Sequence, residues 1–218
     1  RLFAFVLFLP LLLPVVYTPD KGEFEVTMLD VGQGLSLVIR TANHVLVYDA
    51  GDRFSDQFDS GADLVLPYLR SLREPVIDML LVSHGDKDHA GGVAGILAGM
   101  PVLRRWSGTP ELLSPDAGFN PCREGMHWRW DGVDFFMLNP SVASEAGRSN
   151  NRSCVLRVAN ARHTVLLTGD SEQAVERRLT ASGLDLHAQV LIVPQHESKT
   201  SSSTGFIQAV NPDLALFS

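Results

Sequence analysis

Cysteine is scarce in this chain of 218 residues, which has only Cys122 and Cys154. They are too far apart for a CxxC zinc or redox motif, and neither lies in the signature of a catalytic cysteine. Charged residues are also few, at 20%, which excludes a disordered tail or a coiled coil. The sequence leaves two buried thiols and a disulfide both open, and favours the disulfide only outside the cytoplasm.

Net positive charge is missing as well, because the formal charge is −7 at pH 7. Proteins that bind nucleic acids usually carry a basic surface, so this balance alone argues against one. Two bound divalent cations would bring the charge to about −3 and concentrate positive charge in one cleft. The net charge therefore does not identify the substrate.

One long apolar run is present, and it opens the chain at residues 1–17. After Arg1 the run carries no charge, and its length is near the lower limit of roughly 17 residues for a bilayer span. Pro10 and Pro14 argue against a buried core helix. The run also lacks a small-x-small cleavage site, which argues against a cleaved signal peptide. We expect the end of a transmembrane helix, a linker at residues 18–22, and the following domain outside the cytoplasm.

Residues 23–218 predict one domain in which strand hairpins are followed by helices. Strands are expected at 23–29, 35–41, 44–51, 76–84, 153–160, 163–170, 188–196 and 213–218, and helices at 63–72, 90–100, 171–182 and 206–210. The middle, residues 104–150, is expected to be loop-rich with short strands. This order fits two sheets packed together with helices outside. Because the last strand has no cap, we expect a C-terminal piece to be missing.

Four potential metal ligands fall within six residues, directly after the apolar strand that ends near residue 84. They are His84, Asp86, Asp88 and His89. Groups packed so closely would repel or desolvate one another unless a cation balanced them. Asp170 and His196 end two further apolar strands, so three strand ends can converge on one edge and hold two metals. The alternative is a solvated acidic turn that contains histidines.

This pattern, His84-x-Asp86-x-Asp88-His89, resembles the HxHxDH signature of the metallo-β-lactamase fold, with Asp86 in place of the second histidine. With DVGQG at residues 30–34, TGD at 168–170 and the Ser- and Thr-rich segment after His196, it resembles the C-terminal domain of ComEC-type competence proteins. The resemblance covers essentially the whole chain. It implies an α/β (α+β) domain built as an αββα sandwich.

The resemblance also implies two divalent metal ions, Zn²⁺ or Mn²⁺. One ion would take His84 and Asp86, and the other Asp88, His89 and His196, with Asp170 bridging them. Catalysis would fall to Asp88 and His84, assisted by the ions, which lower the barrier to phosphodiester hydrolysis. The extra carboxylate of Asp86 favours the harder ion, Mn²⁺. Substrate phosphate would meet the hydroxyls and amides of Ser198, Lys199, Thr200 and Ser201.

By the same resemblance, the domain is expected to be a nuclease of a DNA-uptake channel that degrades the strand not imported. It would lie in the periplasm, attached to the bacterial inner membrane. Its partners would be DNA, the transmembrane channel part of the same polypeptide and other competence proteins. A non-catalytic DNA-guiding module and a small-molecule hydrolase of the same fold are the alternatives. Gln195 and Glu197 depart from the family pattern His-His-Gly-Ser and place the strength of the activity in question.

Basic and aromatic residues also interleave at Arg104-Arg105-Trp106 and at Trp128-Arg129-Trp130, with Arg123 nearby. Such groups can stack on bases and neutralise phosphates. A Trp-x-Trp pattern on a strand is more often core packing, with the arginine facing outward. We expect His127 and His163 not to be metal ligands.

Overall fold

The computed structural model describes residues 16–141, 147–193 and 202–217. Among these residues, none of the helices is long and apolar enough to cross a membrane. Residues 1–15, which carry most of the predicted transmembrane segment, lie outside the described residues. The predicted boundaries of the membrane segment and the linker therefore stay predictions.

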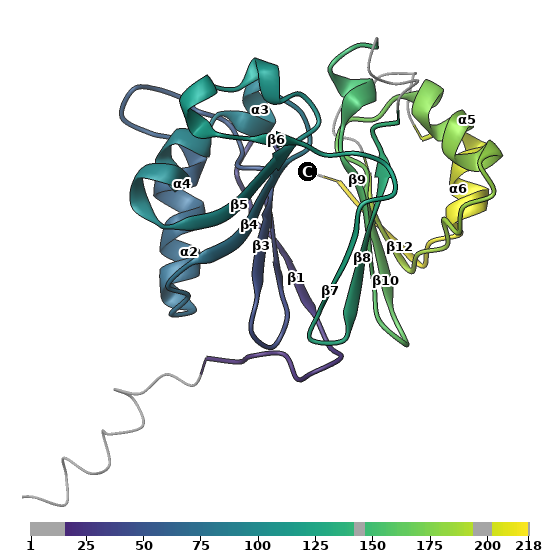
Figure 1. Ribbon diagram of the computed structural model, residues 1–218, viewed down its shortest axis with the longest axis horizontal. Coiled ribbons are helices and arrows are strands. Elements are labelled where there is room, and N and C mark those ends of the chain that lie inside the picture. Colours follow the sequence, from purple (N-terminus) through teal and green to yellow (C-terminus); the bar gives the residue numbers. More distant parts are fainter. Residues whose placement is uncertain (1–15, 142–146, 194–201, 218) are drawn as a thin grey trace, which may run out of the picture.

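Two six-stranded sheets face each other, with helices on both outer sides (Figure 1). The first sheet has the order β1 (Glu25–Met28), β2 (Leu37–Arg40), β3 (Val45–Tyr48), β4 (Ile77–Val82), β5 (Val102–Ser107) and β6 (Asn120–Pro121). The second has the order β12 (Leu214–Leu216), β11 (Val190–Ile192), β10 (Thr164–Leu167), β9 (Val155–Ala159), β8 (Val133–Asn139) and β7 (His127–Trp130). The predicted αββα sandwich is confirmed.

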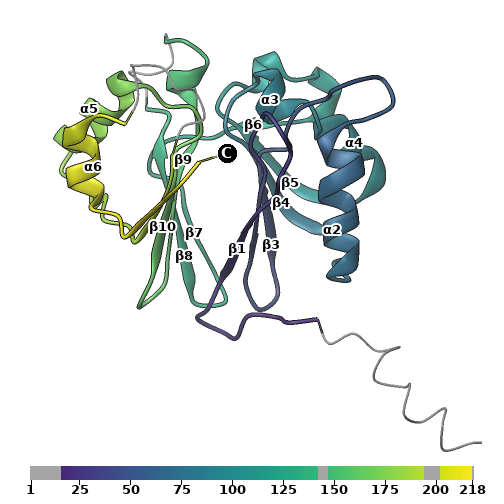
Figure 2. The same cartoon turned by 180° about the vertical axis from the view of Figure 1, so that it is seen from behind.

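Helices cover the outer face of each sheet, as both views show (Figures 1 and 2). On the first sheet these are a π-helical turn at Gly61–Val65, α2 (Leu66–Ser71), α3 (Lys87–Ala90) and α4 (Val93–Gly99). On the second they are α5 (Gln173–Ala181) and α6 (Thr204–Val210). Short 3-10 turns lie at Pro110–Leu112, Pro115–Ala117 and Asn150–Arg152. The strands β3, β4 and β5 run parallel, so their carboxyl ends meet at one edge, beside the carboxyl end of β10.

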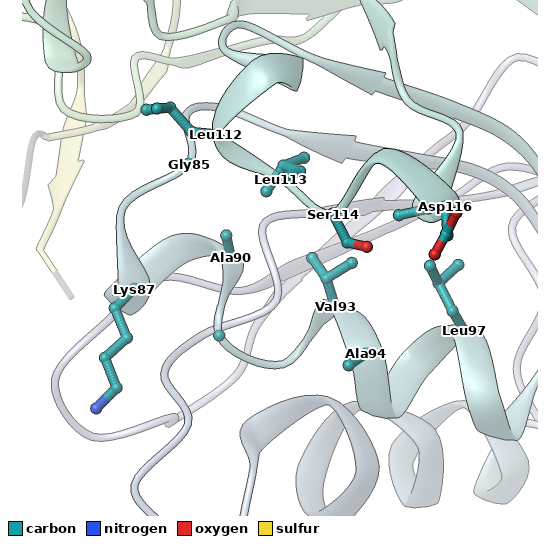
Figure 3. Close-up of a pocket in the computed structure, with 12 residues that line it drawn as sticks. Gly85, Lys87, Ala90, Val93, Ala94, Leu97, Leu112, Leu113, Ser114 and Asp116 are labelled. Carbon is teal, nitrogen blue, oxygen red and sulfur yellow. The ribbon is translucent and has the colours of Figure 1, made fainter.

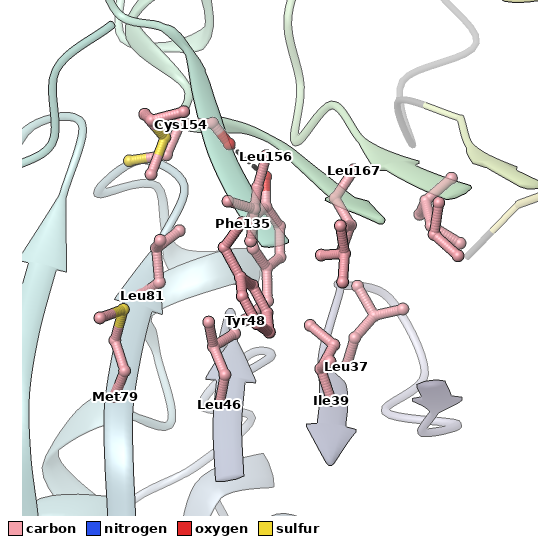
Figure 4. Close-up of a cluster of buried hydrophobic side chains, with 14 of the residues drawn as sticks. Leu37, Ile39, Leu46, Tyr48, Met79, Leu81, Phe135, Cys154, Leu156 and Leu167 are labelled. Atoms are coloured by element: carbon pink, nitrogen blue, oxygen red, sulfur yellow. Dashed lines mark hydrogen bonds between the residues drawn. The ribbon is translucent and has the colours of Figure 1, made fainter. Parts of the chain in front are cut away.

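The central strands are apolar on both faces because each face packs against a different layer. In β2, Leu37 and Ile39 point to the other sheet while Val38 between them packs under the helices, as the alternation of a strand requires. The core between the sheets holds large side chains from both layers, among them Tyr48 and Phe135 (Figure 4). This core fixes how the two sheets dock.

The prediction of a short-stranded middle was wrong at β8, whose seven residues form the longest strand among those described. Its residues Val133, Phe135 and Met137 point into the core and alternate with less buried positions. A tight turn joins it to β7, and both turn residues have positive φ, Asp131 at 50° and Gly132 at 92°. Asp-Gly in such a turn is a strong hairpin signal that the sequence reading missed.

Cys122 and Cys154 form a disulfide, with their Cα atoms 6.3 Å apart and both side chains buried. This decides between the two possibilities that the sequence left open. Cys122 lies just after β6, where the chain passes to the second sheet, and Cys154 precedes β9 in that sheet. The bridge closes a separation of 32 residues, which is worth about 3–4 kcal/mol in the chain-entropy model. It joins the two sheets at the edge where β4 ends.

At the opposite end of the sandwich, the Asp131 carboxylate joins two hairpin turns. It accepts hydrogen bonds from the Thr41 hydroxyl at 2.7 Å, from the Asn43 backbone at 2.8 Å and from the Asn43 amide at 2.7 Å. Desolvation opposes ionisation there, but these donors outweigh it and lower the pKa of Asp131 below its ordinary value. The ionised carboxylate therefore stabilises the contact between the sheets.

We predict that Asp131→Asn lowers the free energy of unfolding at pH 7 by about 1 kcal/mol, since one charged acceptor is lost from a partly solvated site. Asparagine tolerates the positive φ, so the turn itself is retained. The lowered pKa means that the stabilisation is full above the ordinary pKa of about 3.8 and is lost as the pH falls through the lowered value. Urea unfolding at several pH values measures the difference between variant and native protein.

Asp56→Asn is the matched control, because the Asp56 side chain is fully exposed and, within the part of the chain that the structure describes, bonds only to neighbouring Arg53. It should leave the free energy of unfolding unchanged, because a fully exposed ion pair contributes little to stability. A difference for Asp131→Asn that stays constant down to the most acidic pH would contradict the role given to its charge.

Candidate metal centre

Three buried side chains meet at the edge where β4 and β10 end. His84 follows β4, His89 lies in α3 and Asp170 follows β10, and one ligand atom from each falls within 4.8 Å of the others. The His89 Nε2 atom is 3.3 Å from Asp170 Oδ1, and the two imidazole ring centroids are 4.3 Å apart. The cluster draws on both sheets, so it exists only when the sandwich is assembled.

Hydrogen bonds from behind orient the two imidazoles. His89 Nδ1 is 2.8 Å from Asp49 Oδ2, and His84 Nδ1 is 3.1 Å from the Ser83 hydroxyl. Their Nε2 atoms are buried and have no hydrogen-bond partner among the described residues. Buried polar atoms are rarely left in that state, and a histidine that binds a metal typically bonds a carboxylate or hydroxyl through its other nitrogen. The residues present therefore fit a divalent cation.

Asp49, which the sequence analysis missed, is the buried centre of this support. Its Oδ1 accepts from the Ser83 backbone at 2.6 Å, while its Oδ2 accepts from the Ser83 hydroxyl at 2.8 Å. A positive φ of 60° at Asp49 turns the chain at the end of β3 and aims the carboxylate at the neighbouring strand. A signal was available, since Asp49 ends an apolar strand as Asp170 does.

The glycine-rich segment at residues 30–34 packs from the side against residues 83–89, the candidate metal-binding loop. A Cβ at Gly34, where φ is 138°, would clash with the carbonyl oxygen of Asp88. The same carbonyl accepts from the Leu35 backbone at 3.2 Å, and the Leu35 carbonyl accepts from Gly51 at 2.9 Å. Glycine at residue 34 thus allows three loops to pack at backbone distance and holds Asp88 in place.

The electrostatic field of the cluster favours positive charge. Burial would lower the pKa of His89, but Asp49 and Asp170 outweigh burial and raise it well above the ordinary value. Burial, and then the neighbouring His89, lower the pKa of His84. The cluster thus favours one positive charge and disfavours a second, because two neighbouring imidazolium ions would repel each other. A metal cation held by neutral imidazoles and a carboxylate satisfies the same field.

Asp86 and Asp88 lie at the mouth of the cluster. Asp86 Oδ2 is 3.5 Å from His84 Nε2, and Asp88 Oδ2 is 3.7 Å from His89 Nε2. Their side chains are 42% and 24% exposed, whereas both histidines are fully buried. Each aspartate is thus beside a different histidine. The assignment of these groups to two separate ions stays a prediction.

The remaining predicted site residues lie outside the described residues. They are the metal ligand His196, the substrate-binding residues Ser198, Lys199, Thr200 and Ser201, and the two departures from the family pattern, Gln195 and Glu197. His127 and His163 are both exposed and do not belong to the metal cluster found among the described residues.

An apolar hollow of about 460 Å³ adjoins the metal-binding loop on the side of the helices (Figure 3). Gly85, directly after His84, forms part of its wall, and Leu112 and Leu113 form another part. The Gly85 backbone donates to the Thr109 hydroxyl at 2.7 Å, and a Cβ at Gly85 would lie 2.5 Å from Leu112 Cβ. The turn at Pro110–Leu112 therefore packs directly on the metal-binding loop.

Residues 29–217 match the metallo-beta-lactamase superfamily. The chain belongs to this superfamily. The match includes all the clustered residues and the glycine-rich segment beside them. The expectation drawn from the motif at residues 84–89 is confirmed at the level of the superfamily.

Named relatives include a competence protein and a recombination protein. The chain is 38% identical over 208 residues to "Competence protein ComA" of Neisseria gonorrhoeae, covering 94% of this chain and 28% of that protein. It is also 38% identical over 208 residues to "Recombination protein 2" of Haemophilus influenzae, covering 91% of this chain and 24% of that protein. The chain thus spans about a quarter of the length of these relatives.

The fold is shared with a solved metallo-beta-lactamase fold protein, YhfI from Bacillus subtilis. The TM-score is 0.57 at 12% sequence identity, with 90% of this chain and 86% of that chain covered. This likeness supports the architecture of the metallo-beta-lactamase domain.

We predict that Asp49→Asn weakens the binding of Mn²⁺ or Zn²⁺ by about 10–100-fold, because the amide cannot replace a carboxylate that holds His89 and Ser83 at once. Competition with a chromophoric chelator measures the affinity, and circular dichroism establishes that the variant is folded.

Asp78→Asn is the matched control. Asp78 bonds His44 Nδ1 at 3.0 Å and the Val45 backbone at 2.9 Å, which reproduces the same chemistry at a distant position of the same sheet. It should leave metal affinity unchanged. Equal affinities for both variants and the native protein would show that Asp49 does not orient the ligands.

Proposed function

We propose that this chain is a metal-dependent phosphodiesterase domain that cuts DNA during DNA uptake. The observation that carries the proposal is the cluster of His84, His89 and Asp170, in which two buried imidazole nitrogens face one point without a hydrogen-bond partner among the described residues. The names of two relatives, a competence protein and a recombination protein, favour DNA as the substrate.

The roles of the residues follow from their positions. His84, His89 and Asp170 would hold divalent ions, Zn²⁺ or Mn²⁺, with Asp86 and Asp88 at the mouth. His196 would be the sixth ligand. When bound, such ions activate water for attack on phosphorus and stabilise the charge that develops on the leaving oxygen.

The protein's own groups orient and move protons around this chemistry. Asp49 and Ser83 keep both imidazoles turned with Nε2 forward, so the site needs no rearrangement when substrate arrives. Asp88 is partly exposed and close to the centre, which suits it to accept the proton of the attacking water. Asp170 is buried and held by a hydrogen bond from its backbone to the Ser153 hydroxyl at 3.2 Å.

We place the domain in the periplasm, on the bacterial inner membrane. The disulfide between Cys122 and Cys154 supports this location, because disulfides persist in oxidising compartments and are rare in the cytosol. The apolar run at the start of the chain is consistent with an adjoining membrane part. The partners would then be incoming DNA, a channel in the same polypeptide and other competence proteins.

We predict cleavage of DNA that requires Mn²⁺ or Zn²⁺ and is abolished by EDTA. His84→Ala and Asp170→Ala should each lower the rate by at least 100-fold, because each removes a ligand from a buried cluster. Asp170→Ala should also lose most of the bound metal. Gel analysis of labelled DNA measures the rate, and elemental analysis of the same preparations measures the metal.

His163→Ala is the control, since His163 is an exposed histidine in the hairpin turn between β9 and β10 and lies at the opposite end of β10 from Asp170. It should retain full activity and full metal content. If the native protein bound metal fully yet cut neither single-stranded nor double-stranded DNA, the result would contradict the nuclease proposal and favour a DNA-guiding module.

A further inference from the structure

The side of the sandwich between β5 and β7 carries two adjoining cavities of about 350 Å³ and 290 Å³. Arg123 and Arg152 line the first, and Arg104, Trp106 and Trp128 line the second. A lining residue of one is bonded to a lining residue of the other, because the Arg123 backbone donates a hydrogen bond to the sulfur of Met126 at 3.2 Å. We call the two cavities together the edge groove.

The edge groove is positive although the chain as a whole carries a charge of −7. Its lining contains three arginines and one acidic residue, Glu111, so its formal charge is +2. Arg152 bonds Glu111 through both ends of its guanidinium. Arg104 and Arg123 are exposed and form no ion pair with any residue in the described ranges. Two cations are therefore available to an anionic ligand.

Aromatic rings lie beside these cations. All three tryptophans of the chain are in this region, and Trp106 and Trp128 are half-buried in the lining of the groove. The Trp128 ring stacks on Phe135, with centroids 5.0 Å apart and planes 7° from parallel. Trp130 lies behind them in the core. The predicted core packing is confirmed for Trp130, and Trp128 packs against the same core, as does Trp106. Both Trp106 and Trp128 nevertheless remain partly exposed in the lining of the groove.

One lining residue of the edge groove, Arg152, lies next to the metal cluster in the chain. Arg152 directly precedes Ser153, whose hydroxyl accepts from the Asp170 backbone at 3.2 Å and is 3.5 Å from His84 Nδ1. The end of the groove that contains Arg152 is therefore the end beside the metal cluster. In Figure 1 the edge strands β6 and β7 border this side of the molecule.

We propose that the edge groove binds one unpaired strand of DNA and leads it to or from the metal centre. The arginines would contact successive phosphates, and a base would stack between the two half-buried tryptophans. Exposed cations beside aromatic rings are the chemistry that binds single strands without sequence preference. Duplex DNA does not match, because its bases are already stacked inside the helix. The identity of the ligand as DNA rests on the proposed function.

The test measures binding without cleavage. In EDTA, a single-stranded oligothymidylate should quench the tryptophan fluorescence of the purified chain, and a duplex of the same length should quench it much less. Arg104→Gln combined with Arg123→Gln should weaken binding by at least tenfold. It should also reduce the slope of log affinity against log salt by about 1.4, the value for two phosphate contacts on a single strand.

The matched control combines Arg129→Gln with Arg177→Gln, which removes the same charge from other surfaces. Arg129 points outward from β7 toward Asp134, and Arg177 is exposed on α5. This pair should leave the affinity and the quenching unchanged. An equal loss of affinity in the control variant would show that only the overall charge of the protein matters, and it would overturn the proposal. An abasic strand that quenched as strongly as oligothymidylate would overturn the stacking.

The same variants separate this proposal from the nuclease. If the double variant Arg104→Gln, Arg123→Gln lost strand binding in EDTA and also cut DNA more slowly with Mn²⁺, the groove proposal and the nuclease proposal would both be supported. If binding and quenching held but no metal restored cleavage, the groove would stand and the nuclease would fail. If the double variant bound and cut single strands as the native chain does, the groove proposal would be overturned and the nuclease proposal would be supported.

Discussion

The Asp49 carboxylate is the interaction on which the metal edge depends. It is fully buried, and burying a charge is unfavourable unless hydrogen bonds compensate for it. Its donors are the backbone and hydroxyl of Ser83 and the imidazole of His89. Because Ser83 also contacts His84, a single carboxylate sets the positions of both histidines. Loss of that charge would release two ligands together.

The two sheets contribute unequal parts to one site. The first sheet supplies the histidines and their support, and the second supplies Asp170 and the Ser153 hydroxyl that holds it. The apolar core between the sheets, the disulfide at the metal edge and the Asp131 contacts at the far edge all act on the same docking. A change in that docking would move Asp170 relative to His89, so the stability of the sandwich and the geometry of the site are coupled.

The features that the sequence predicted are those that follow from local pattern. Apolar strands that end in His84 or Asp170 indicated both the sandwich and the cluster, because strand ends meet at one edge. Asp49 was missed since Asp-Ala-Gly after a strand is equally typical of a turn. The strand β8 was missed because Asp131-Gly132 lay among loop-forming residues. The pairing of the cysteines required tertiary structure, since Cys122 and Cys154 are 32 positions apart.

The chain approaches the sandwich at the end far from His84, His89 and Asp170, where the Gly22 backbone donates to the Asp131 carbonyl at 2.7 Å. From there β1 runs toward the metal edge, and the chain reaches the glycine-rich segment beside Asp88. A six-residue strand such as β4 spans about 20 Å, so roughly that clearance separates the two ends. Attachment to a surface through the N-terminal side would therefore leave the metal edge facing away from that surface and open to solvent.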